Sequence, residues 1–80
     1  MSVVVYTMPN CVQCDRTKKY LETKDITYST IDISKSKEAY ELVSSLGYRQ
    51  APVVVAGESH WAGFRPDKID IIKTAKEKTQ

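Results

Sequence analysis

Two cysteines three residues apart, Cys11 and Cys14, are the residues of this chain best suited by type and spacing to do chemistry. They follow the β-forming run Val3-Val4-Val5-Tyr6 and precede a helix-like stretch. A Cys-x-x-Cys pair at a strand-to-helix junction places a thiol at the positive end of a helix dipole, where the thiolate is stabilised and becomes nucleophilic. The pair therefore predicts dithiol redox chemistry.

The helical pattern after the first cysteine gives the two sulfurs unequal roles. Cys14 shares one helix face with Leu21, so we expect Cys14 to face inward and Cys11 to lie at the exposed first turn. Cys11 would then attack a target disulfide, and Cys14 would resolve the mixed disulfide. Val12 and Gln13 carry no charge, which leaves the helix dipole and backbone N–H groups to stabilise the Cys11 thiolate.

Two other uses of the cysteines fit less well. As a permanent crosslink, so short a loop would contribute roughly 2 kcal/mol, against roughly 3 kcal/mol for a fifteen-residue loop. A soft-metal site could use Met8 with both thiolates, since two thiolates can hold copper(I), but Pro9 separates Met8 from Cys11. Structural zinc requires four ligands, and His60 is the remaining histidine.

Hydrophobic periodicity predicts seven elements in the order β-α-β-α-β-β-α. The expected strands are residues 2–6, 27–33, 53–56 and 59–62, and the expected helices are residues 12–23, a helix capped by Ser34 or Ser36, and a helix starting at Pro66. The expected buried positions of the last two helices are Ala39, Leu42, Val43, Leu46, Ile69 and Ile72. Gly47 suits the end of the second helix, and Gly57-Glu58 suits a hairpin turn.

This order of elements defines the fold class as α/β. The first β-α-β unit needs a right-handed crossover and gives two parallel strands, and the hairpin adds two antiparallel strands. We expect a four-stranded mixed sheet of the thioredoxin kind, flanked by three helices, in one domain covering residues 1–80.

Two further segments are expected to meet the cysteines. A proline that opens a strand cannot donate a ladder hydrogen bond, and Pro52 in this position would face the Cys-x-x-Cys turn. We expect a cis Ala51–Pro52 bond, which would expose the backbone of Ala51 to an extended substrate segment. The second segment is the run Trp61-Ala62-Gly63-Phe64-Arg65-Pro66-Asp67. Its small residues leave the backbone approachable, and Trp61 or Phe64 would add apolar contact surface together with Val12 and Pro52.

Composition limits the partners. The net charge of +2 is too small to indicate binding to nucleic acid or a membrane surface. The N-terminal residues resemble neither a signal peptide nor a spanning helix, so we expect a cytoplasmic protein. Nothing in the sequence requires more than a monomer.

These motifs together resemble the NrdH-redoxins, small glutaredoxin-like proteins of the thioredoxin-fold superfamily. The resemblance covers essentially the whole chain, and its specific part is the Trp-x-Gly-Phe-Arg-Pro-Asp run. The family usually has serine where this chain has Ala62, which removes one side-chain hydrogen bond. The resemblance implies Cys11 as nucleophile, Cys14 as resolving thiol and Pro52 as the cis-proline.

The resemblance also implies the electron partners. Proteins of this family receive electrons from NADPH through the flavoprotein thioredoxin reductase, and donate them to the large subunit of class Ib ribonucleotide reductase. No cofactor is expected to be bound beyond the Cys11–Cys14 disulfide. Gly63-Phe64 replaces the glycine pair of a glutathione site, so Phe64 is expected to obstruct glutathione. A glutathione-dependent glutaredoxin and a copper- or zinc-binding module are the alternatives.

Overall fold

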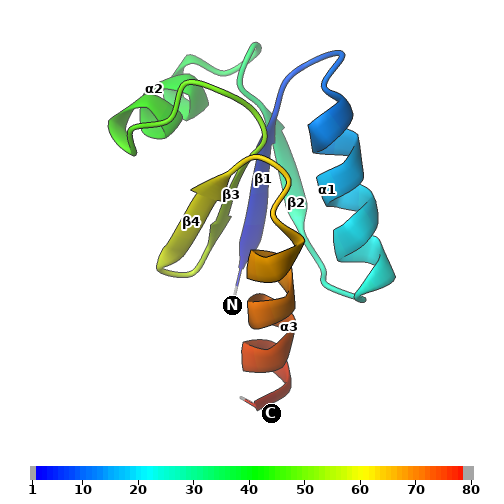
Figure 1. The fold of residues 1–80 in the computed structure, drawn as a ribbon. Helices are drawn as coiled ribbons and strands as arrows, with labels where there is room; N and C mark the ends of the chain where they lie inside the picture. The colour runs from blue at the N-terminus through cyan, green and yellow to red at the C-terminus, as the bar shows by residue number, and fades with distance from the viewer. Residues whose placement is uncertain (1, 79–80) are drawn as a thin grey trace.

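The computed structural model describes residues 2–78 and builds them around one four-stranded sheet (Figure 1). The elements follow the expected order: β1 (Val3–Thr7), α1 (Val12–Thr23), β2 (Ser29–Asp32), α2 (Lys37–Ser45), β3 (Val53–Ala56), β4 (Ser59–Ala62) and α3 (Pro66–Lys78). The strand order across the sheet is β2-β1-β3-β4. β1 runs parallel to β2 and antiparallel to β3, and β4 runs antiparallel to β3. The predicted mixed sheet is confirmed.

The helices divide between the two faces of the sheet. α1 and α3 cover one face, here called the α1/α3 face, and α2 covers the opposite face, here called the α2 face (Figure 1). Side chains alternate between these faces along each strand. Neighbouring residues of β3 demonstrate this, since Val54 packs in the α1/α3 core and Val53 packs in the α2 core.

Apolar side chains of the two helices meet the sheet in a large core on the α1/α3 face. This core consists of Val3, Val5, Leu21, Ile26, Val54, Ala56, Trp61, Ile69 and Ile72. The α2 core consists of Tyr6, Ile33, Ala39, Val43 and Val53. The predicted burial of Ile69 and Ile72 is confirmed.

The sequence predictions for the second helix are partly corrected. Ser36 is the N-cap, and its hydroxyl accepts the N–H of Ala39 at 3.2 Å. Gly47 follows the helix with a positive φ of 93°, as expected for that position. Leu42, however, is 42% exposed. The helix is only Lys37–Ser45, and its buried stripe is the i, i+4 pair Ala39 and Val43, so Leu42 falls on the flank.

The second strand is shorter than the predicted range of 27–33. Residues ahead of β2 are held by the end of α1 instead of by the sheet. The N–H of Ile26 bonds to the carbonyl of Leu21 at 2.9 Å, and the hydroxyl of Tyr28 bonds to Glu22. The first strand is shifted by one residue from the predicted 2–6. None of the described helices is long and apolar enough to cross a bilayer.

Candidate active site

The cysteine pair lies where the chain leaves β1 and enters α1. Cys11 is the N-cap of α1, with extended backbone angles, and it is joined to Cys14 by a disulfide. The N–H of Cys14 points at the Cys11 sulfur at 3.0 Å, and the N–H of Asp15 bonds to the Cys11 carbonyl at 3.2 Å. The Cys11 sulfur thus takes the place of a capping oxygen at a helix N-terminus. Partial positive charge there favours a thiolate.

The two sulfurs differ in access as expected. Cys14 is 1% exposed and packs with Thr17 and Leu21 on the inner face of α1, whereas Cys11 is only half-buried. The charges near the turn are directed elsewhere. Lys18 pairs with Asp15 at 3.5 Å, and the Asp15 side chain is 78% exposed. An attacking reagent therefore reaches Cys11 first, and backbone N–H groups face the sulfur that it meets.

Two other loops are linked by hydrogen bonds to the turn that carries the cysteines, one directly and the other through its neighbour. The first contains the Ala51–Pro52 bond, which is cis as expected. The second follows β4, and the N–H of Gly63 bonds to the carbonyl of Pro52 at 2.8 Å. The N–H of Phe64 bonds to the side-chain oxygen of Gln13 at 3.4 Å. Segments far apart in the sequence are therefore joined around the disulfide.

The expected apolar contact surface is only partly present. Val12 is 66% exposed, and Phe64 is half-buried. Pro52 is fully buried, so the prediction that its side chain adds contact surface is wrong. Of the two aromatic alternatives, Trp61 is 5% exposed and belongs to the α1/α3 core, which leaves Phe64 as the one that offers surface. Trp61 alternates with its neighbours along β4, and its pairing partner Val54 points into the same core.

Phe64 is held by a residue that the sequence reasoning missed. The rings of Tyr20 and Phe64 meet edge to face with centroids 5.8 Å apart. The Tyr20 hydroxyl donates to Asp70 on α3 at 2.8 Å, and Lys24 lies 3.5 Å from the same carboxylate. The hydrogen bond to Asp70 raises the pKa of Tyr20. Little in the sequence indicated this contact, because Tyr20 lies about two turns along α1 from the cysteines and belongs to no motif.

Arg65 and Asp67 form a pair at the start of α3. The guanidinium donates to both carboxylate oxygens, at 3.1 and 2.9 Å. The hydrogen bond with Arg65 holds the pKa of Asp67 below its ordinary value. Both side chains are largely exposed, at 48% and 61%. Ala62 and Gly63 are half-buried and present mainly backbone. The pair therefore connects the residue before α3 to the first turn of that helix, next to the loop that contacts the cysteine turn.

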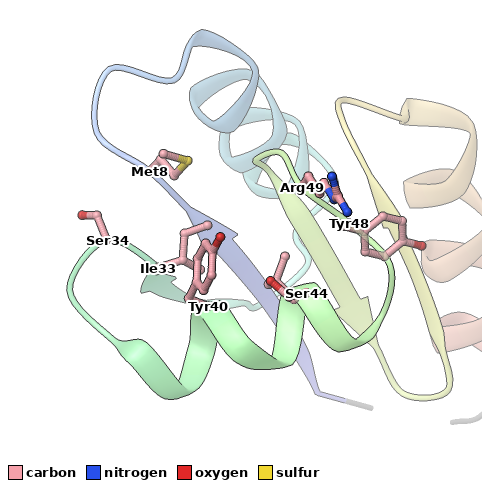
Figure 2. A pocket seen from close by; sticks show the side chains of 8 residues that line it. Met8, Ile33, Ser34, Tyr40, Ser44, Tyr48 and Arg49 are labelled. Carbon is pink, nitrogen blue, oxygen red and sulfur yellow. The ribbon is translucent and has the colours of Figure 1, made fainter.

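The α2 face contains a cavity of about 220 Å³ that the sequence did not indicate. Its lining comes from four segments and consists of Met8, Ile33, Ser34, Tyr40, Val43, Ser44, Tyr48 and Arg49 (Figure 2). None of the residues predicted for the redox site lines it. Met8, the candidate third ligand for a soft metal, lies here with 44% of its surface exposed. The ring of His60 instead contacts the hydroxyl of Tyr48 at 2.8 Å.

Among residues 2–78, no group of three or more His, Cys, Asp or Glu side chains could hold a metal ion. The donors available at the turn are the two cysteine sulfurs, which are bonded to each other. The arrangement suits reversible disulfide exchange, with one accessible sulfur and one shielded sulfur.

Known proteins resemble this chain in sequence and in structure. Residues 3–61 match the glutaredoxin family. The glutaredoxin-like protein NrdH of Escherichia coli strain K12 is 40% identical over 75 residues, which cover 94% of this chain and 93% of that protein. The corresponding protein of Lactococcus lactis subsp. cremoris is 37% identical over 67 residues, covering 84% of this chain and 93% of that protein.

Solved structures give the same result. The structure of NrdH-redoxin from Escherichia coli, described as having a thioredoxin-like activity profile, superposes with a TM-score of 0.86 at 41% identity. The superposition covers 89% of this chain and 93% of the Escherichia coli NrdH-redoxin chain. A glutaredoxin from Archaeoglobus fulgidus superposes with a TM-score of 0.73 at 26% identity, over 89% of this chain and 84% of that chain.

Proposed function

The chain belongs to the glutaredoxin family, among its NrdH-redoxins, and from that premise we propose that it carries electrons from thioredoxin reductase to class Ib ribonucleotide reductase. Membership makes the protein a thiol–disulfide oxidoreductase. The observation that carries the proposal is the Cys11 sulfur at the α1 N-terminus, which accepts the Cys14 N–H while Cys14 stays shielded.

The reaction would proceed in two exchanges. In the reduced protein, the Cys11 thiolate attacks one sulfur of a client disulfide, which forms a mixed disulfide and releases the other client sulfur as a thiolate. Cys14 then loses its proton to solvent and attacks the Cys11 sulfur. The second client sulfur leaves, and the Cys11–Cys14 disulfide forms. Two electrons have passed to the client, and its two thiolates take up protons from solvent.

The N-cap position explains why Cys11 would be the nucleophile. A thiolate there receives the N–H of Cys14 at a distance already set by the helix, and it lies at the positive end of the α1 dipole. Ionising a buried sulfur costs more, and Cys14 is almost fully buried. Attack by Cys11 and resolution by Cys14 follow from this difference.

The surface around the disulfide is suited to an extended protein segment. The backbone of Ala51 precedes the cis bond to Pro52 and would pair with such a segment, while Val12 and Phe64 supply apolar surface. Phe64 is fixed against Tyr20, so its ring would keep glutathione from settling on the Gly63–Arg65 backbone. We therefore propose thioredoxin reductase, which uses NADPH and bound flavin, as the electron source in the cytoplasm.

Two reconstituted electron-transfer systems test which reductase supplies the electrons. The oxidised protein is supplied with NADPH and thioredoxin reductase, or with glutathione, glutathione reductase and NADPH, and NADPH consumption is followed with class Ib ribonucleotide reductase as acceptor. We expect turnover with the first system and little with the second. The Cys11→Ser variant supplies the background rate. Turnover driven only by glutathione would reject the proposed partner.

A further inference from the structure

The side chain of Gln13 makes a contact that its position between the cysteines does not require. Its oxygen accepts the N–H of Phe64 at 3.4 Å, although the two residues are 51 positions apart. The same oxygen lies 3.5 Å from the point where a Cβ on Gly63 would stand. Gln13 thus lies along the edge of the loop that follows β4.

That loop is held from several sides. The N–H of Gly63 is bonded to Pro52, and the next N–H, that of Phe64, is bonded to Gln13. The Phe64 ring rests on Tyr20. Gly63 itself has a φ of 84°, which favours glycine and allows the loop to turn between these anchors. Of these anchors, Gln13 alone belongs to the segment between the two cysteines.

The two residues between the cysteines therefore differ in what their side chains do. Val12 is directed to solvent and makes apolar surface available. Gln13 connects the turn to Phe64, so the loop and the Cys11 sulfur are held in one arrangement. An ordered edge lowers the entropy lost when an extended client binds, because the loop is already in place. A small disulfide that touches only Cys11 gains nothing from that order.

We propose that Gln13 is a positioning residue that locks the Gly63–Phe64 loop to the Cys11–Cys14 turn and thereby favours protein disulfides over small disulfides. The inference rests on the proposed function only in that the clients are proteins. It assigns Gln13 no contact with the reacting sulfurs. Its effect falls on binding, so it should lower the second-order rate constant for a protein client and leave that for a small disulfide unchanged.

Three substitutions separate the hydrogen bond from other properties of the side chain. Gln13→Ala removes the acceptor, and Gln13→Asn shortens the side chain by one methylene, too short for a bond that is already 3.4 Å long. Gln13→Glu keeps both the reach and an acceptor oxygen. Amide hydrogen exchange at Phe64, measured by NMR, should accelerate in the Ala and Asn variants and stay slow in the Glu variant.

The kinetic test uses protein reduced chemically with dithiothreitol and then freed of it. Its reaction is measured with insulin as a protein disulfide and with 2-hydroxyethyl disulfide as a small one. For Gln13→Ala and Gln13→Asn, the ratio of the insulin rate to the small-disulfide rate should fall roughly two- to tenfold, the range expected for one hydrogen bond. The ratio cancels any change in Cys11 ionisation, which matters for the Glu variant, whose ratio should stay at the parent value.

Thr23→Ala is the matched control, since it truncates a polar side chain on α1 whose hydroxyl bonds to the carbonyl of Lys19 within the same helix. It should change neither rate. Equal loss of both rates in Gln13→Ala, or unchanged exchange at Phe64, would overturn the proposal. No reductase or ribonucleotide reductase enters this assay. Failure of thioredoxin reductase to reduce the parent protein would therefore reject the proposed function and leave the role of Gln13 in place.

Discussion

The two faces of the sheet differ in how completely helices cover them and in how large a core they bury. On the α1/α3 face, two helices cover the sheet over a large core, and Asp70 on α3 accepts the hydroxyl of Tyr20 in α1 and pairs with Lys24, the residue that caps the end of α1. On the α2 face, one short helix covers a smaller core and leaves a cavity of about 220 Å³ beside it (Figure 2). The cysteines belong to the helix on the better-covered face.

This difference indicates that the α1/α3 face is the more rigid support for the reactive turn. A reactive turn keeps its geometry only if the elements beneath it do not shift, and packed helices hold such geometry better than loops do. Cys14 is part of the packing on α1, together with Thr17 and Leu21. The same contacts that stabilise α1 therefore fix one sulfur of the pair, while Cys11 projects from the end of the helix.

The largest expected effect separates the two sulfurs within the α1/α3 face. Cys11→Ser should reduce disulfide exchange by several orders of magnitude, because the nucleophile is lost. Cys14→Ser should keep the first exchange and accumulate mixed disulfides with clients, because nothing resolves them. Mass spectrometry of the reaction with insulin distinguishes the two. Normal turnover by the Cys14 variant would show that the shielded sulfur is not needed.

A matched pair of valines compares the packing of the two faces directly. Val54 and Val53 are adjacent in β3, both fully buried, and point into opposite cores. Val54→Ala should lower the free energy of unfolding by about 2–3 kcal/mol, from lost transfer energy and a retained cavity. Val53→Ala should cost about 1 kcal/mol less, because a more loosely covered face can close around the gap. Urea denaturation measures both.

Equal losses in the two valine variants would contradict the contrast between the faces. The slope of the unfolding free energy against urea serves as the internal check. A changed slope would indicate an altered unfolded or native state in place of a simple change in stability.

The sequence predicted the element order, the Gly57-Glu58 hairpin turn and the unequal burial of the cysteines, because these follow from local patterns. Apolar spacing fixed the inner face of α1, and glycine at position 47 fits the positive φ found there. The contact of Gln13 with Phe64 and that of Tyr20 with Phe64 depend on how distant loops meet. Such contacts carry no local pattern.

Trp61 demonstrates the same limit from the other direction. The motif suggested either Trp61 or Phe64 as apolar contact surface, and the alternation of β4 directs Trp61 into the α1/α3 core beside Val54. The cavity on the α2 face was also missed, since its lining comes from four separate segments. Face assignment in a short edge strand depends on register, which the sequence of that strand alone does not determine.

A smaller effect concerns Tyr28, which follows α1 in the chain and packs against the α1/α3 core. Burial, reinforced by the hydrogen bond to Glu22, raises the pKa of Tyr28 to about 12. The phenol is an acid whose folded-state pKa is raised, so its contribution to stability is complete below pH 10 and is lost as the pH rises toward 12. Tyr28→Phe should therefore lose less stability than the parent across that interval. Parallel curves of unfolding midpoint against pH would contradict this assignment.

The smallest effect compares two carboxylates, one at the end of β2 and one in the first turn of α3. Asp67 lies at the start of α3, where the hydrogen bond with Arg65 lowers its pKa, and Asp32 precedes α2, where hydrogen bonds from the hydroxyl and the backbone N–H of Ser34 lower its pKa. Both carboxylates stabilise the fold above their ordinary pKa of 3.8, and both contributions fade as the pH falls through the depressed values.

Added salt should change the pKa values of these two carboxylates by different amounts, because their main partners differ in charge. Screening weakens the attraction between Arg65 and Asp67, so added salt should move the pKa of Asp67 up toward its ordinary value. The neutral hydroxyl and N–H of Ser34, which contribute more to the lowered pKa of Asp32 than the charge of Lys35 does, are much less sensitive to screening, so Asp32 should move less. Carbon NMR titration of the carboxyl groups at low and high salt measures both in one sample. Arg65→Gln should raise the pKa of Asp67 and abolish most of its salt dependence while leaving Asp32 in place. A salt response of equal size at the two carboxylates would mean that the guanidinium contributes no more at the start of α3 than a serine does ahead of α2.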